Sequence, residues 1–351
     1  MIPNKASFLS TSADKSIDLF ILKNQNNVQA AITNYGCRLV SLLVPDRKGT
    51  LIDVVTGYDS VESYWKKDEP YFGAVIGRYG NRIAKGTFTL NDKTYNLEIN
   101  NGPNALHGGS KGFNAQIWNA NQVSDQMLEL NYYSEDGEGG YPGNLQVKVI
   151  YTLTERNELR IDYEAKTDAT TIVNLTNHAY FNLNGEGKET ILDHELMINA
   201  AGFIPIDPTS IPLGYIGDVE GTPFDFRQPK EIGSQIEEQH EQLINGQGYD
   251  HTFVLSHPRN TLGLCAIAKG KEAGIVMEVL TTEPGVQFYS ANFLKGKDSD
   301  GKGGNSYPRR SAFCLETQHF PDSPNRENFP STVLNPGETF RSTTVYRFSL
   351  G

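Results

Sequence analysis

Strict alternation of apolar and polar side chains is the feature that most restricts the fold of this chain. In the stretch ELRIDYEAKT, Leu159, Ile161, Tyr163 and Ala165 alternate with charged residues. Successive side chains of a β-strand point to opposite faces, so this pattern is typical of a strand with one buried face. The stretch LQVKVIYTL at 145–153 repeats the pattern, and the ERNE sequence between the two predicts a hairpin turn.

Further strands are expected in VQAAITNYG, GIVMEVLTT, GVQFYSANF and TTVYRFSL, together with a hairpin that turns near Asn91 and Asp92. Helical signals are few: DSVESYWKKDEP predicts a short helix from Ser60, and GSQIEEQHEQLI predicts a second one. Because 34 Gly and 17 Pro separate many short strands, we predict an all-β fold, a large antiparallel β-sandwich with few short helices.

No stretch of biased composition divides the chain, so we expect a single domain over residues 1–351. The stretch KGKDSDGKGGNSYPRR is the most linker-like segment, and we expect it to form a mobile surface loop.

The charge of the chain restricts its partners. A formal net charge of −11 argues against nucleic acid and against anionic membrane surfaces, which both attract basic proteins. The N-terminal stretch lacks the apolar core of a signal peptide, and no apolar run is long enough to span a membrane. We therefore expect a cytoplasmic protein, a monomer or a weak homodimer, that acts on a small molecule.

Cys37, Cys265 and Cys314 are widely spaced, which predicts buried inert thiols rather than disulfides or a zinc site.

Candidate functional residues gather in Gly-, Asn- and Pro-rich stretches that contain aromatic residues. These stretches are GRYGNRIAKG, NNGPNALHGG, NLTNHAYFNLNG, GQGYDHTFVL and FCLETQHFPDSPN. They contain neither the spacing of a phosphate-binding loop nor the GxSxG turn of a serine hydrolase. A mixture of hydrogen-bonding and aromatic side chains is typical of a sugar-binding site.

Each candidate also has a purely structural interpretation. Taken alone, His178 in NLTNHAYF is better explained as a structural hydrogen-bonding residue. Glu316 follows an apolar run, where a carboxylate without a partner is costly, so a functional role is at least as good an explanation. His107, His178 and Glu316 also form a possible set of metal ligands, two histidines and one carboxylate. His251 and His319 are expected to be bystanders.

Together, the amino-acid sequences of these stretches and their order along the chain resemble those of the aldose 1-epimerases, also called galactose mutarotases. The motifs are YFGAVIGRYGNRIAKGTF, PNALHGG, VNLTNHAYFNL, GYDH, TTEPGVQFY and LETQHFPDSPN, and the likeness runs from about Gly36 to the end of the chain. The resemblance implies a galactose mutarotase-like supersandwich that interconverts the α and β anomers of glucose and galactose, with no metal and no organic cofactor. It also assigns roles: His178 is the general acid and Glu316 the general base, and the sugar-binding residues are Asn81, Arg82, His107, Asp250 and Gln287.

Those roles agree with elementary acid–base chemistry. An ordinary Glu, with a pKa of about 4.3, is ionised at neutral pH and accepts the proton of the C1 hydroxyl. A His, with a pKa of about 6.5, stays protonated beside an anion and supplies a proton to the ring oxygen.

Three other classes of protein remain open at this point. A glycoside hydrolase needs two carboxylates, and Asp250 is available as the second. A carbohydrate-binding module would need the aromatics but neither His178 nor Glu316. A sugar-phosphate epimerase would need further basic residues at the site, which we cannot place beyond Arg78 and Arg82.

Overall fold

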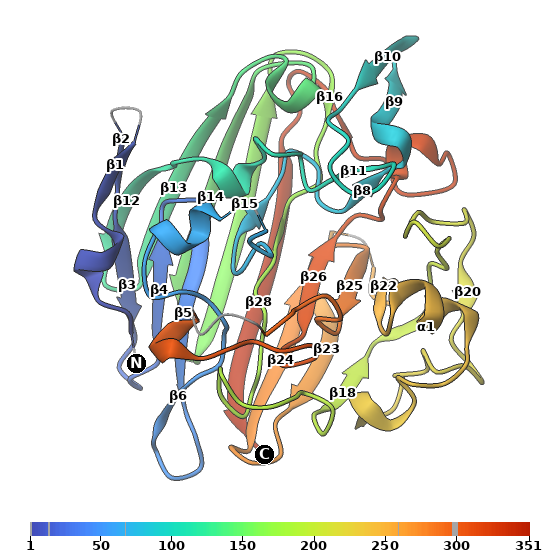
Figure 1. The fold of residues 1–351 in the computed structure, drawn as a ribbon. Helices are drawn as coiled ribbons and strands as arrows, with labels where there is room; N and C mark the ends of the chain where they lie inside the picture. Colours follow the sequence, from blue (N-terminus) through green and yellow to red (C-terminus); the bar gives the residue numbers. More distant parts are fainter. Residues whose placement is uncertain (1, 13–14, 67, 259, 297–300) are drawn as a thin grey trace.

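Two layers of antiparallel sheet make up most of the protein. The computed structural model describes residues 2–12, 15–66, 68–258, 260–296 and 301–351. A nine-stranded sheet forms the back layer in Figure 1, in the order β12 (Asn119–Ser124), β13 (Met127–Ser134), β14 (Leu145–Leu153), β15 (Glu158–Thr167), β28 (Phe340–Leu350), β24 (Ile275–Thr281), β23 (Gly263–Lys269), β18 (Glu195–Ile198) and β21 (Lys230–Glu231).

Two smaller sheets lie in front of it. One has the order β3 (Leu19–Lys23), β4 (Gln29–Thr33), β5 (Arg38–Pro45) and β6 (Leu51–Asp53). The other has the order β20 (Gly217–Asp218), β19 (Ala200–Phe203), β22 (Asp250–Leu255), β25 (Gly285–Tyr289) and β26 (Cys314–Gln318). Side chains of all three sheets share one apolar core. The predicted antiparallel sandwich is therefore confirmed.

Short elements complete the fold. Five two-stranded ladders pair β1 (Ser10–Ser12) with β2 (Lys15–Ile17), β7 (Val75–Ile76) with β17 (Thr176–Asn177), β8 (Arg82–Ile83) with β11 (Ala105–Leu106), β9 (Thr87–Leu90) with β10 (Lys93–Asn96), and β16 (Thr171–Ile172) with β27 (Val333–Leu334). The 3₁₀ turns are η1 (Lys5–Phe8), η2 (Glu62–Trp65), η3 (Ala84–Gly86), η4 (Phe113–Ala115), η5 (Glu138–Gly140), η6 (Ile232–Ser234), η7 (Lys302–Gly304) and η8 (Ser323–Asn325). In the described part of the chain, α1 (Glu241–Gly246) is the sole α-helix. None of the described helices has the length and apolarity that a transmembrane helix requires.

The alternating stretches occupy the centre of the large sheet, as expected. Strands β14 and β15 pair antiparallel around the ERNE turn, and the apolar face of each is buried. Asn91 and Asp92 both have positive φ and connect β9 to β10, which matches the predicted hairpin. Strand β28, although last in sequence, lies in the middle of the sheet between β15 and β24.

Three local expectations need correction. The helix expected from Ser60 is a 3₁₀ turn over Glu62–Trp65, and the second helix begins only at Glu241. The stretch expected as a surface loop, residues 295–310, is anchored near its middle. Lys302 is buried, and its Nζ contacts Asp53 Oδ2 at 2.7 Å and donates to the carbonyls of Val40 and Val55. Residues 297–300 of that stretch lie outside the described residues.

Candidate active site

A cavity of about 520 Å³ lies beside β26 and collects most of the residues singled out in the sequence. Its walls come from segments far apart in the chain. The lining includes Asn81, Arg82, His107, His178, Asp250 and Glu316, together with Tyr71, Tyr180, Tyr289 and Phe293. Six of the seven residues expected to contact a sugar therefore face one space, and Gln287 is the exception.

Strand register positions the carboxylates at the floor of the cavity. Strand β26 is buried on both faces, with Leu315 and Thr317 toward the nine-stranded sheet: Thr317 Oγ1 lies 2.5 Å from Thr344 Oγ1 of β28. Glu316 must then point the opposite way, into the cavity, because neighbouring residues of a strand face opposite sides. Gln287 pairs with Glu316 across β25 and β26.

Gln287 does not line the cavity, and its side chain holds Asp250 in place. Its Nε2 donates a 2.7 Å hydrogen bond to Asp250 Oδ1, and its Oε1 accepts one from Thr252. The backbone N–H of Asp250 donates to Nδ1 of His251, which is fully buried and does not line the cavity. His319 also lies outside the cavity lining, with its Nδ1 2.6 Å from Glu283 Oε2.

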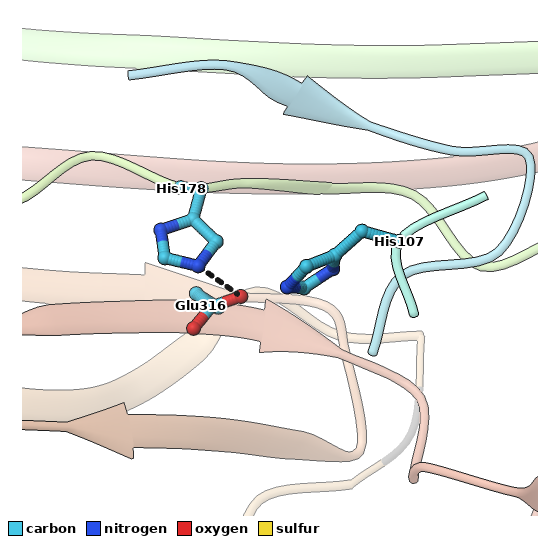
Figure 2. A group of neighbouring side chains, drawn as sticks. All are labelled: His107, His178 and Glu316. Carbon is cyan, nitrogen blue, oxygen red and sulfur yellow. Dashed lines mark ion pairs between the residues drawn. The ribbon is translucent and has the colours of Figure 1, made fainter. Parts of the chain in front are cut away.

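His178 and Glu316 face each other at the centre of the site. His178 Nε2 lies 3.6 Å from Glu316 Oε2, and both side chains are almost completely buried (Figure 2). Glu316 Oε2 has no hydrogen-bond partner among the described residues. A ligand that lies beside both atoms can give a proton to one and accept a proton from the other, because a separation of 3.6 Å leaves no room for a further atom between them.

Burial acts against charge on both members of this pair. It lowers the pKa of His178 to about 3. It raises the pKa of Glu316 well above the usual range, and the nearby Asp250 adds to this while Arg82 opposes it. The pair can exist as a neutral carboxylic acid with a neutral imidazole, or as a carboxylate with an imidazolium. The two forms have the same number of protons and differ only in which residue holds the one that they share. The ionised carboxylate expected from an ordinary Glu is therefore only one of two protonation states that the site supports.

His107 is held as a hydrogen-bond donor. The ladder between β8 and β11 brings it beside Asn81, whose backbone N–H donates to His107 Nδ1 at 3.1 Å while the N–H of His107 donates to the Asn81 carbonyl. Burial, aided by His178 and Arg82, lowers the pKa of His107 well below its usual value, so the ring is neutral. Since Nδ1 accepts a hydrogen bond, the proton of this neutral ring must be on Nε2.

This tautomer argues against the metal-site interpretation. His107, His178 and Glu316 each offer a ligand atom, and these atoms lie within 4.8 Å of one another. A histidine that binds a metal through one nitrogen normally donates a hydrogen bond from the other. His107 does the reverse, because its second nitrogen accepts the Asn81 N–H. The residues present therefore fit a hydrogen-bonding site better than a metal centre.

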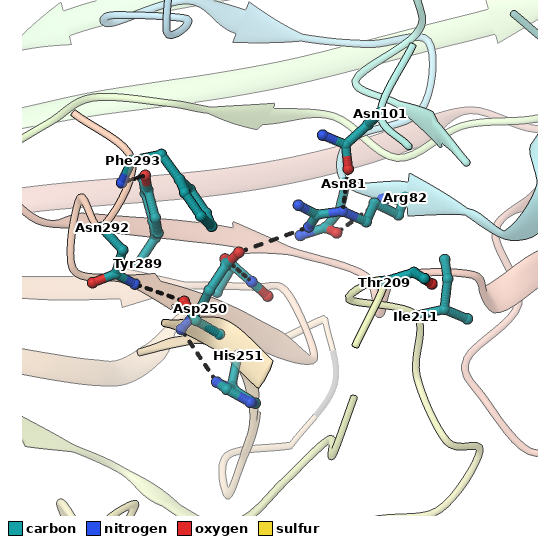
Figure 3. A network of polar contacts seen from close by, with 12 residues as sticks. Asn81, Arg82, Asn101, Thr209, Ile211, Asp250, His251, Tyr289, Asn292 and Phe293 are labelled. Atoms are coloured by element: carbon teal, nitrogen blue, oxygen red, sulfur yellow. Dashed lines mark hydrogen bonds and ion pairs between the residues drawn. The ribbon is translucent and has the colours of Figure 1, made fainter. Parts of the chain in front are cut away.

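A polar network closes the side of the cavity next to these residues. Arg82 Nη1 lies 3.8 Å from Asp250 Oδ2, and Arg82 Nε donates to Asn101 Oδ1 at 3.0 Å (Figure 3). Asn81 has a φ of +65°, a left-handed conformation that Asn adopts more readily than most residues. Its Oδ1 accepts the backbone N–H of Arg82 at 2.8 Å. Fixed donors and acceptors thus surround the space next to His178 and Glu316.

The comparisons with known proteins identify the family. A family model described as Aldose 1-epimerase matches residues 18–347. The chain belongs to the aldose 1-epimerase family. The resemblance found in the sequence motifs is thereby confirmed.

Members of this family are similar over nearly the whole chain. Galactose mutarotase of Bos taurus is 48% identical over 335 residues, which cover 95% of each chain. Aldose 1-epimerase of Escherichia coli K12 is 36% identical over 332 residues, covering 94% of each. The solved structure of an aldose epimerase homologue from C. elegans has a TM-score of 0.87 at 30% identity, covering 95% of this chain and 98% of that chain.

The aromatic wall of this epimerase-family site was not predicted. Tyr180 stacks on the His178 ring with centroids 5.0 Å apart, and Tyr71 stacks at 5.9 Å. Tyr289 and Phe293 stack on each other at the rim, where Phe293 is 45% exposed. Tyr71, Tyr180 and Tyr289 lie within the motif stretches, so the aromatic content of those motifs was the available signal.

Proposed function

We propose that this chain catalyses the interconversion of the α and β anomers of a neutral aldose, with Glu316 as the general base and His178 as the general acid. The observation that carries the proposal is the 3.6 Å separation of Glu316 Oε2 and His178 Nε2 inside a cavity lined by hydrogen-bonding side chains. Anomer exchange requires one proton to leave the C1 hydroxyl and one to reach the ring oxygen. Two facing groups that share one proton fit this requirement.

Ring opening follows from the carboxylate–imidazolium form of the pair. Glu316 Oε2 removes the proton of the C1 hydroxyl, the C1–ring oxygen bond breaks, and His178 Nε2 gives its proton to the ring oxygen. The products are an open-chain aldehyde, a neutral carboxylic acid and a neutral imidazole, so the proton count is unchanged. Rotation about the C1–C2 bond presents the other face of the aldehyde. Ring closure then reverses both proton transfers.

Burial supports this exchange. The two protonation forms of the pair must be close in free energy for the proton to pass in both directions, and desolvation brings them closer by opposing the charge-separated form. Matched pKa values favour general acid–base catalysis, which typically contributes about 10²–10⁴-fold for each group. No covalent intermediate is required.

The neighbouring residues would bind and orient the sugar. The Nε2–H of His107 is a fixed donor beside the pair, suited to the oxygen that carries negative charge as the ring opens. Arg82 and Asp250 offer a donor and an acceptor to ring hydroxyls, while Gln287 would act by holding Asp250. Tyr289 and Phe293 offer apolar surface to the C–H face of a sugar ring.

Polarimetry tests the proposal. Wild type should speed the approach of freshly dissolved α-D-glucose or α-D-galactose to anomeric equilibrium, and Glu316→Gln and His178→Ala should match buffer. His257→Ala, which changes a histidine outside the cavity lining, is the matched control and should behave as wild type. Turnover by Glu316→Gln at the wild-type rate would refute the assignment of the base. Release of the aglycone from an aryl glycoside would instead favour a hydrolase.

A further inference from the structure

The imidazole of His178 contacts two side chains of a single strand, one through each of its ring nitrogens. Cys314 and Glu316 are two residues apart on β26, so both point to the same face. Cys314 Sγ lies 3.6 Å from His178 Nδ1, and Glu316 Oε2 lies 3.6 Å from His178 Nε2. Each ring nitrogen therefore has its own contact on β26, and the contact at Nδ1 has no part in the chemistry described so far.

We propose that the sulfur of Cys314 accepts a hydrogen bond from His178 Nδ1–H and thereby fixes the tautomer and orientation that proton transfer at Nε2 requires. Cys314 is in this sense a positioning residue and does not touch the substrate. The inference rests on the proposed function, because only a reaction at Nε2 gives the tautomer its importance.

The proton balance at the ring explains the requirement. When the imidazolium gives the Nε2 proton to the ring oxygen, the neutral ring that remains has its proton on Nδ1. Ring closure takes a proton back at Nε2, so Nδ1–H persists through both steps. A neutral ring in the other tautomer has no lone pair at Nε2 and cannot take part. An acceptor beside Nδ1 favours the competent tautomer, as the carboxylate does in a Ser-His-Asp triad.

Cys314 is well placed to be that acceptor. The carbonyl of His178 itself accepts the N–H of Gly73 at 3.0 Å and also interacts with the imidazole, where it raises the pKa of His178 against the effect of burial; Cys314 Sγ is the side-chain contact of Nδ1. Burial, together with Glu316 and Asp250, raises the pKa of the Cys314 thiol well above its usual range, so the sulfur is a neutral thiol and not a thiolate. Stacking of Tyr180 on the imidazole limits movement of the ring out of its plane. The contact with Cys314 then sets the rotation of the ring within that plane.

A weak acceptor suits this site better than a strong one. A carboxylate beside Nδ1 would stabilise the imidazolium strongly and hold the proton that must be delivered. A thiol sulfur is a weak acceptor, so it selects the tautomer while changing the acidity of Nε2 little. It also remains uncharged, which avoids a further buried charge next to Glu316.

Two substitutions at the same position separate positioning from packing. Cys314→Ala removes the acceptor and should lower kcat by about tenfold, the effect of one lost hydrogen bond, with KM within about twofold of wild type. Cys314→Ser restores an acceptor and should keep kcat within about threefold of wild type. Cys265→Ala is the matched control, because it deletes a fully buried thiol on β23 that does not line the cavity. It should lose stability but keep kcat.

Nitrogen NMR of the histidine rings supplies a measurement that does not depend on turnover. In ¹⁵N-histidine-labelled wild type, the His178 signals, assigned by their loss in His178→Gln, should show the Nδ1–H tautomer, and Cys314→Ala should show a mixture. A wild-type ring protonated at Nε2 alone, a wild-type kcat in Cys314→Ala, or equal losses in the Ala and Ser variants would overturn the inference. Absence of anomer exchange by wild type would refute the proposed function instead, since the ring spectra report the tautomer in either case.

Discussion

Replacing Glu316 with Gln should make the protein inactive and more stable. Glu316 Oε2 is buried without a hydrogen-bond partner among the described residues, and its position raises the pKa of the carboxyl well above the usual range. A buried polar group left without a partner costs about 1–3 kcal/mol, and more when it is charged. The Gln side chain is neutral, and its amide can donate to His178 Nε2. We therefore expect the free energy of unfolding to rise by about 1–3 kcal/mol at pH 8.

The expected change in melting temperature is small but measurable. Unfolding entropies of about 2.1 cal/mol/K per residue give this 351-residue chain about 0.7 kcal/mol/K, so the gain corresponds to about 1–4 °C in Tm. Calorimetry at matched protein concentration, with urea denaturation as a second probe, resolves a difference of this size.

The gain should depend on pH in a defined direction. A carboxyl whose pKa is raised in the folded protein contributes full stability below its unfolded pKa of about 4.3 and loses that contribution as the pH rises through the folded value. The advantage of Glu316→Gln should therefore be small near pH 4.5 and grow toward pH 8. Measurements at both pH values test the sign independently of the magnitude.

Glu283→Gln provides the matched control. Glu283 is also a buried carboxylate beside a histidine, but its Oε2 lies 2.6 Å from His319 Nδ1 and it does not line the active-site cavity. Because this carboxylate has a close partner, its replacement should lower stability and leave turnover intact. If Glu316→Gln were as stable as wild type or less stable at pH 8, the Glu316 carboxylate would be favourably paired in the folded protein, and the reasoning would be refuted.

Three further predictions follow from other residues. Asp250→Asn should raise KM for the sugar by about tenfold while kcat changes less, since it removes a charged acceptor and the partner of an arginine; initial rates over a range of sugar concentrations check this. Lys302→Met should lower the free energy of unfolding by about 3–5 kcal/mol, because it leaves Asp53 as a buried carboxylate without a charged partner. Urea denaturation of the double variant Lys302→Met, Asp53→Asn should show that part of this loss is recovered. Burial lowers the pKa of His194 to about 4 and of His251 to about 3. The free energy of unfolding should therefore fall as the pH drops below about 6.5, by up to about 1.4 kcal/mol per pH unit for each histidine. Urea midpoints that stay constant from pH 7 to pH 5 would contradict this.

The positions of strands could be predicted from the sequence where one face of the strand is exposed to solvent. Strands β14 and β15 show alternation because their outer faces are partly exposed, and the turn between them has typical composition. The segment before α1 misled the prediction for a physical reason. Ile232 and Ile236 are buried and Gln235 accepts a hydrogen bond from Lys230, so tertiary contacts override helix propensity until His240 caps the helix at Glu241.

Most of the residues that line the cavity could be predicted from the sequence, but their arrangement in space could not. Resemblance to the family supplied His178 and Glu316, yet Gln287 does not line the cavity and instead donates a hydrogen bond to Asp250, a contact that depends on the pairing of β22, β25 and β26. Cys314 was expected to be a buried inert thiol, and its burial is confirmed. Its contact with His178 joins residues 136 positions apart, a relation that no local sequence pattern reveals.

The central place of β28 in the large sheet has a consequence for synthesis. Phe340–Leu350 lies between β15 and β24 (Figure 1), so the strands on its two sides cannot join into one sheet before these residues leave the ribosome. The nascent chain must carry two incomplete sheet halves, each with an unpaired edge, until Phe340–Leu350 has been translated. The nine-stranded sheet of this enzyme can therefore close only after β28 has been made, and a ribosome-bound chain that stops before Phe340 should remain sensitive to protease.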